Sequence, residues 1–153
     1  MTSNKLVQQI SEMEALVNKA NLVNDGVSSA SIGWHLEHTL MVLERALTAL
    51  DNCTIVDYKP KSSFRKTIIL FTKKIPRGVA KAPKAARPIA ENITNENLLS
   101  RISSVKKLLD NIPSMSSHQF FSHPFFGDLR LKKAIRFLEI HTNHHLKIMR
   151  EIG

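Results

Sequence analysis

The chain has 153 residues, enough for one domain with a core of its own, and 42% hydrophobic with 23% charged residues is typical of a globular protein. Its single cysteine, Cys53, excludes an internal disulfide framework, and no apolar run is long enough to span a membrane. The first ten residues lack the apolar centre of a secretory signal, so we expect one cytoplasmic domain over residues 1–153.

Four segments carry apolar residues at helical spacing and predict four helices. The first covers about residues 4–23, and the second opens at Ser28 or Ser29 and continues to about residue 51. The third begins near Thr94 and ends at Pro113, and the fourth covers about residues 129–152. The predicted core stripes are Leu6, Ile10, Met13, Val17 and Ala20; Ile32, Leu36, Leu43, Ala46 and Leu50; Leu98, Ile102, Val105, Leu109 and Ile112; and Leu131, Ala134, Leu138, Ile148 and Ile152.

Four amphipathic helices of this length most simply form an all-α four-helix bundle, and no alternating strand pattern competes with them. A short turn joins the first helix to the second, so we expect these two to be antiparallel neighbours. About 40 residues separate the second helix from the third, which permits a crossover connection.

The connection between the second and third helices carries the positive charge of the chain. The net charge is +9, and ten basic and no acidic residues lie between Tyr58 and Ala90. We predict a short helix over about residues 62–74, followed by an exposed, partly extended loop over residues 79–88. Residues 59–87 could contact nucleic acid or another polyanion in a non-enzymatic binding module. No aromatic residue lies between Thr72 and Pro88 to stack on bases, so a solvated loop is the simpler interpretation.

Five of the seven histidines fall in two short clusters. In the fourth helix, His141 and His145 occupy core positions one turn apart, whereas His144 lies toward the edge of the apolar face. Histidines at i and i+4 can bind one metal ion, although an isolated pair of this kind is more often exposed or hydrogen-bonded in a core. The central place of this pair on the apolar face favours a site more strongly, because burying imidazoles without a purpose is costly. The second helix carries His35 and His38, at a similar height if the two helices are antiparallel; helical periodicity modestly favours His35 as a third ligand.

Several motifs together resemble the DinB/YfiT-like superfamily, and most closely a branch of small bacterial domains of unassigned function. These motifs are SHPFFG at residues 122–127, HTNHHLK at 141–147, SIGWHLEH at 31–38 and the basic PRGVAKAPKAARP at 76–88. The resemblance implies an up-down-down-up four-helix bundle that holds a divalent metal ion. Its ligand positions fall on His38, His141 and His145, which leaves His35 as a supporting group or an alternative ligand.

Three neutral imidazoles would leave a coordination position open on zinc or nickel, or on manganese or iron. Characterised members of the superfamily include thiol-dependent transferases and isomerases, so the resemblance implies a metal-dependent thiol S-transferase or hydrolase. Its substrate would be a small molecule, such as a low-molecular-weight thiol. Relatives often form homodimers, and the resemblance allows one here.

Four other features are interpreted structurally. We expect His123 to fix the loop that enters the fourth helix, and Cys53 to be an inert thiol. Glu37 and Glu139 should point away from the ligand face. The phenylalanines of residues 120–126 should plug one end of the bundle.

Overall fold

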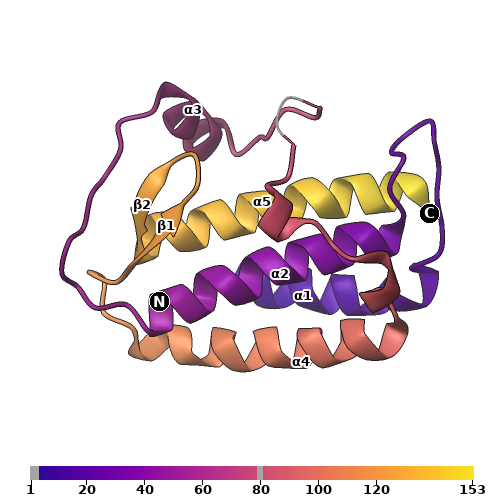
Figure 1. Ribbon diagram of the computed structural model, residues 1–153, viewed down its shortest axis with the longest axis horizontal. Helices are drawn as coiled ribbons and strands as arrows, with labels where there is room; N and C mark the ends of the chain where they lie inside the picture. The colour runs from indigo at the N-terminus through magenta and orange to yellow at the C-terminus, as the bar shows by residue number, and fades with distance from the viewer. Residues whose placement is uncertain (1–3, 79–80) are drawn as a thin grey trace.

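A computed structural model describes residues 4–78 and 81–153 of the chain. The described part is mostly helical, with a small two-stranded sheet (Figure 1). The α-helices are α1 (Asn4–Ala15), α2 (Ile32–Asp51), α3 (Phe64–Thr72), α4 (Asn95–Asn111) and α5 (Leu131–Ile152). The strands are β1 (Phe120–His123) and β2 (Gly127–Arg130), and single 3-10 turns are η1 (Val17–Lys19), η2 (Lys84–Ala86), η3 (Ala90–Asn92) and η4 (Ile112–Ser114).

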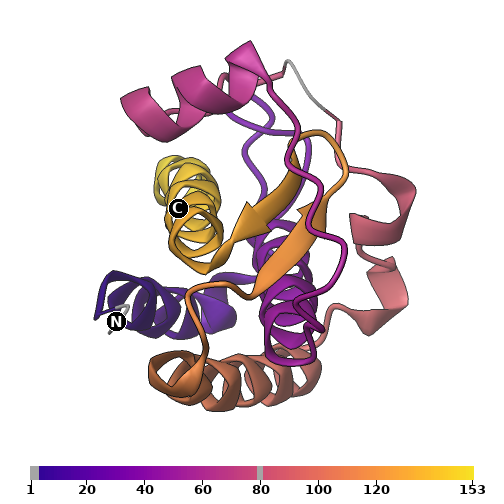
Figure 2. The same ribbon diagram turned by 90° about the vertical axis from the view of Figure 1, so that its left-hand side faces the viewer.

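The four long helices surround one hydrophobic core. Every residue of the four predicted stripes is buried, which confirms the helical periodicity. The end-on view in Figure 2 shows α1, α2, α4 and α5 gathered around this core. We expected α1 and α2 to be direct neighbours, but each makes its main contacts with α4 and α5 instead.

The helix boundaries differ from the prediction at the start of the chain. The first helix ends at Ala15, and the chain continues as a 3-10 turn in which Val17 still faces the core. Ser31, not Ser28 or Ser29, caps α2, because its Oγ accepts a hydrogen bond of 3.1 Å from the backbone N–H of Trp34. Ser28 is therefore free to contact other groups.

The prediction that the chain has no strands is wrong, because residues 120–130 form a hairpin that precedes α5. Each strand has only four residues, too few to produce a clear alternating pattern. Gly127 in the turn has a φ of +69°, and a Cβ there would lie 2.8 Å from the Cβ of Lys61. Glycine is therefore needed both for the backbone conformation and for the close approach of the basic connection.

His123 fixes the hairpin turn, as expected. Its Nδ1 accepts hydrogen bonds of 3.1 Å from the backbone N–H groups of both Phe125 and Phe126. Its ring also stacks on Phe126, with 4.4 Å between the ring centroids. The expected plug is only partly formed, since Phe121 and Phe126 are buried but Phe125 is 59% exposed.

The basic connection is tied to the bundle more closely than we expected. Two residues of the predicted loop, 79 and 80, lie outside the described residues. In the described remainder, η2 places the carbonyl groups of Ala85 and Ala86 against α2, where they accept hydrogen bonds from Arg45 and His38. Half of the described residues of this loop are exposed and the other half are partly buried, and its backbone is anchored. Among residues 4–78 and 81–153, no helix is long and apolar enough to cross a bilayer.

Candidate metal centre

The fold brings three of the clustered histidines together between α2 and α5. One ring nitrogen each from His38, His141 and His145 lies within 4.8 Å of the other two. Nε2 of His38 and Nε2 of His141 are 3.3 Å apart. His38 and His145 are 4% and 8% exposed, and His141 is partly buried. The predicted group of three is therefore assembled, and metal binding by it stays a prediction.

The helices deliver these side chains through their periodicity and their direction. His141 and His145 are one turn apart on α5, so their rings point the same way, with 4.7 Å between centroids. His38 contacts His141, whereas His35, one turn earlier on α2, contacts His145. This reversed order means that α2 and α5 run antiparallel at the site.

The His38 ring is oriented by the basic connection. Its Nδ1 lies 2.6 Å from the backbone carbonyl oxygen of Ala86, which can only accept a hydrogen bond. Nδ1 therefore carries the proton, and the lone pair on Nε2 faces His141. Trp34 stacks on the same ring, with 5.1 Å between centroids and 15° between planes. A backbone carbonyl that fixes the tautomer of a histidine is a recurring feature of metal sites.

The His145 ring is oriented by a chain of two further side chains. Its Nδ1 lies 2.9 Å from Nδ1 of His35, and Nε2 of His35 lies 3.0 Å from the hydroxyl of Ser28. The Ser28 oxygen also accepts a hydrogen bond from the Ala30 N–H. In a consistent assignment, His145 Nδ1–H donates to His35 and His35 Nε2–H donates to Ser28. This leaves Nε2 of His145 as the ring nitrogen with a free lone pair.

His35 is thus a support for His145 and not one of the three converging histidines. The modest preference of the helical wheel for His35 is not met, because a helix between two neighbours has a broad interior face. The wheel placed His35 near the core correctly, since it is only 5% exposed. It could not show that the His35 ring contacts His145 and is not one of the three that converge.

The site holds its imidazoles in the neutral form that a metal ion requires. Burial is the main cause that lowers the pKa of His38, and it is also the main cause that lowers the pKa values of His141 and His145 well below their usual range, helped there by neighbouring histidines. The pKa of His35 falls to about 4, again mainly through burial. His141 is the least supported of the three, because its buried Nδ1 makes no hydrogen bond within the described part of the chain.

A divalent cation fits this arrangement chemically. Three uncharged nitrogen donors converge, and the rings of His38 and His145 are each held by a hydrogen bond at Nδ1. Imidazole suits zinc and nickel, and also iron, without selecting sharply among them. Three protein ligands leave room for an exchangeable fourth, which is typical of catalytic and not of structural zinc sites.

His144 lies beside the group without joining it. Its ring centroid is 5.1 Å from that of His145, but it faces a hollow of about 190 Å³. Lys73, Lys74 and Lys147 line the same hollow. Helical periodicity put His144 toward the edge of the apolar face of the last helix, and this position agrees with it.

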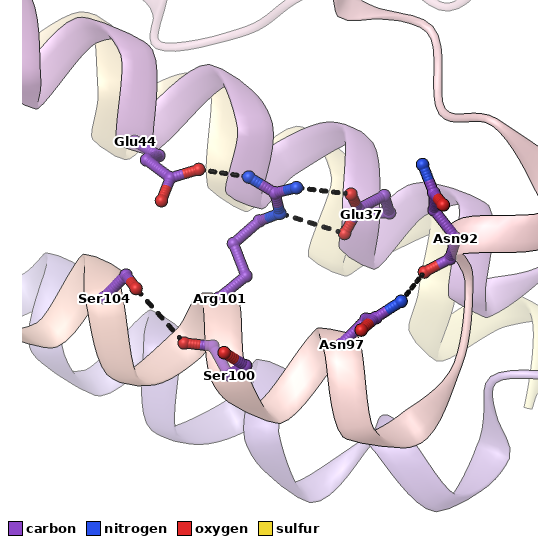
Figure 3. A pocket seen from close by; sticks show the side chains of 7 residues that line it. All are labelled: Glu37, Glu44, Asn92, Asn97, Ser100, Arg101 and Ser104. Carbon is purple, nitrogen blue, oxygen red and sulfur yellow. Dashed lines mark hydrogen bonds and ion pairs between the residues drawn. The ribbon is translucent and has the colours of Figure 1, made fainter.

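Glu37 points away from the histidines, as expected, and is used elsewhere. It is 3% exposed and forms a two-pronged ion pair with Arg101 of α4, in which Nη2 and Oε1 are 3.0 Å apart and Nε and Oε2 are 3.2 Å apart. Arg101 also pairs with Glu44, about two turns further along α2 (Figure 3). This cluster joins α2 to α4 beside a polar pocket of about 330 Å³, and it supplies no carboxylate to the group of three histidines.

Searches against protein-family models, curated proteins and solved structures found no match for this chain. The superfamily resemblance accordingly stays a prediction that depends on the motifs and on the site geometry.

Two groups at the site were not predicted from the sequence. The Ala86 carbonyl is a backbone atom in an unpatterned tract, so no residue type could have marked it. Ser28 was assigned to helix capping, a role that serine at this position suggests and that Ser31 performs instead.

Proposed function

We propose that this chain is a divalent-metal protein in which His38, His141 and His145 hold one ion. The observation that carries the proposal is the convergence of one nitrogen from each ring within 4.8 Å, in a buried setting that keeps the rings neutral. The orientation of His38 by Ala86 and of His145 by His35 is further support.

We place the chain in the DinB/YfiT-like superfamily. The path of the chain in Figure 1 supports the up-down-down-up order of that superfamily: α1 and α5 run toward the end of the bundle that holds the C-terminus, and α2 and α4 run away from it. The ligand positions implied by the resemblance coincide with the three histidines that converge.

The reaction we propose is metal-dependent transfer of a low-molecular-weight thiol, or a hydrolysis. A divalent ion with an open position lowers the pKa of a water or thiol that it binds, so that a nucleophile forms near neutral pH. The protein would contribute orientation through His38 and His145. The hydrogen bond that His145 donates to His35 makes the His145 ring more basic, so that it gives its lone pair more strongly to the metal ion.

Elemental analysis of protein purified without added metal or a polyhistidine tag tests the metal site. We expect about one divalent ion per chain, and loss of that ion in the double variant His141→Ala/His145→Ala. The matched control is His118→Ala/His144→Ala, which removes two histidines outside the group and should keep the ion. A metal content equal to that of the wild type in the His141→Ala/His145→Ala protein would refute the proposal.

The reaction is tested separately from the metal site. Metal-loaded protein should accelerate the consumption of a small thiol in the presence of an electrophile, and chelator-treated protein should not. Equal rates with and without the metal would refute the proposed thiol reaction but not the proposed metal site.

A further inference from the structure

Helix α3 is apolar on two opposite sides. Because a helix turns 100° per residue, Ile69 and Leu70 share one side, and they pack against the core. Phe64, Ile68 and Phe71 share the other side, and they are 81%, 42% and 83% exposed. A surface helix normally presents polar residues on its outer side. The outer side of α3 is therefore an exposed apolar surface, which we call the α3 stripe (Phe64, Ile68 and Phe71).

The stripe stands on a helix that is held in place. Ser63 caps α3 by accepting a hydrogen bond from the Lys66 N–H, and Nζ of Lys66 donates to the carbonyl oxygen of Phe126 in the hairpin. At the other end, Nε of Arg136 donates to the carbonyl oxygen of Leu70, at 2.8 Å. Figures 1 and 2 show α3 at the edge of the molecule, outside the four long helices. The three side chains are thus displayed outward from a fixed position.

Basic side chains flank the stripe on both sides along the chain. Residues 59–78 contain seven lysines and arginines and no acidic residue, and only Lys66 among the seven is buried. Within the described residues, Arg77 is paired with Glu151, and the other exposed members form no ion pair. The exposed members are Lys59, Lys61, Arg65, Lys73, Lys74 and Arg77. An apolar stripe flanked by positively charged side chains is complementary to a surface with a negatively charged outer layer and an apolar interior.

The size of the stripe favours a bilayer over a protein partner. Aromatic side chains bury about 150–250 Å² each, so two phenylalanines and a half-exposed isoleucine offer roughly 400 Å². A stable protein interface takes about 800 Å² from each partner. A lipid surface has no such threshold, because each inserted side chain and each neighbouring cation adds to the attraction separately.

We propose that α3 docks this chain on the surface of an anionic lipid bilayer. Phe64, Ile68 and Phe71 enter the boundary between headgroups and acyl chains. The exposed basic side chains of residues 59–77 contact lipid phosphates. The helix lies along the surface and does not cross it.

Co-sedimentation of the full chain with lipid vesicles tests this proposal. One set of vesicles contains phosphatidylcholine alone, and the other contains phosphatidylcholine and phosphatidylglycerol in equal parts. We expect binding to the second set in low salt, weaker binding in high salt, and little binding to the first set. Equal binding to both sets, or to neither, would overturn the proposal.

Two pairs of variants separate the contribution of the apolar stripe from that of the neighbouring basic side chains. Phe64→Ser/Phe71→Ser should lower the vesicle partition coefficient roughly tenfold or more, whereas Val7→Ser/Leu99→Ser, at half-exposed positions on α1 and α4, should not. Thermal melting confirms that each protein is folded. Wild-type affinity in Phe64→Ser/Phe71→Ser would show that the stripe is not the docking element.

Charge reversal is tested with two variants that lower the net charge by the same amount. Arg65→Glu/Lys74→Glu should also lower the partition coefficient roughly tenfold or more, and Lys5→Glu/Lys107→Glu, at exposed positions of α1 and α4, should leave it unchanged. An equal loss in both variants would mean that attraction depends on net charge alone, against docking through α3.

Other occupants of the stripe give distinct results. Sedimentation velocity that shows a dimer dissociated by Phe64→Ser/Phe71→Ser would assign the stripe to an interface between copies. Binding of a single-stranded DNA oligonucleotide in low salt, without vesicle binding, would assign the basic segment to nucleic acid. Either result replaces the lipid proposal.

Discussion

Replacement of His35 by phenylalanine tests whether the hydrogen bond between His35 and His145 strengthens metal binding. Phenylalanine keeps a ring of similar size in the buried position, so packing against Trp34 is preserved. It removes the ring nitrogen that lies 2.9 Å from Nδ1 of His145 and forms a hydrogen bond with it. The perturbation therefore acts on the orientation and basicity of one proposed ligand and leaves all three in place.

The expected loss follows from that single hydrogen bond. Removing an outer partner of a ligating histidine typically lowers metal affinity about 10–100-fold, or about 1.4–2.7 kcal/mol. The buried Nδ1–H left without an acceptor costs about 1–3 kcal/mol, which agrees with that range. Ser28→Ala breaks the next link, between Ser28 and His35, and should cost less than His35→Phe because His145 keeps its acceptor.

Competition titration of Zn²⁺ against a chelator at pH 7 measures the effect, with a melting curve of the metal-free protein as a check on folding. His144→Phe is the matched control, because its ring neighbours His145 without a hydrogen bond between them, and it should keep wild-type affinity. If His35→Phe binds Zn²⁺ within about twofold of wild type, far from the loss expected for a lost supporting bond, the assigned orientation of His145 is wrong.

Two stability predictions follow from the buried charges and rings. Arg101→Met strands the buried carboxylate of Glu37 and should lower the free energy of unfolding by about 2 kcal/mol or more in urea titrations. Lys106→Met on the same helix breaks an exposed pair and should change it by about 1 kcal/mol or less; equal losses would contradict the importance of burial. Burial lowers the pKa of His123 to about 4 from 6.5, so the unfolded chain binds the proton first and stability falls as the pH drops from 6.5 toward 4. Between pH 7 and pH 5 the wild type should lose roughly 1–2 kcal/mol more than His123→Asn, whose side-chain oxygen can accept the same turn hydrogen bonds without titrating; parallel pH curves for the two proteins would refute this.

The core of the bundle could be predicted because it depends on local periodicity. Backbone hydrogen bonds in a helix join residues four apart, so the spacing of apolar residues such as Leu36, Leu43 and Leu50 shows which side is buried. The same rule placed His141 and His145 on the inner side of the last helix. The resemblance supplied His38 as the third member, where periodicity alone favoured His35.

The hairpin and the cap of α2 were beyond such reasoning. Four-residue strands carry too little pattern, and they form because the turn is fixed by His123 and by the left-handed Gly127. Three of the four residues at positions 28–31 are serines, and the sequence offers no means of choosing among them. In the folded chain the Ser28 hydroxyl contacts His35, and Ser31 caps the helix.

By itself the sequence determined the helices, their buried sides and the presence of two histidine clusters, because these follow from interactions within a few residues. The tertiary structure alone decided which histidines converge and what holds them. His38 meets a carbonyl group 48 residues away, and His35 meets a ring 110 residues away. It also decided that Phe64 and Phe71 face outward, since helix spacing shows that residues share a side but not what that side contacts.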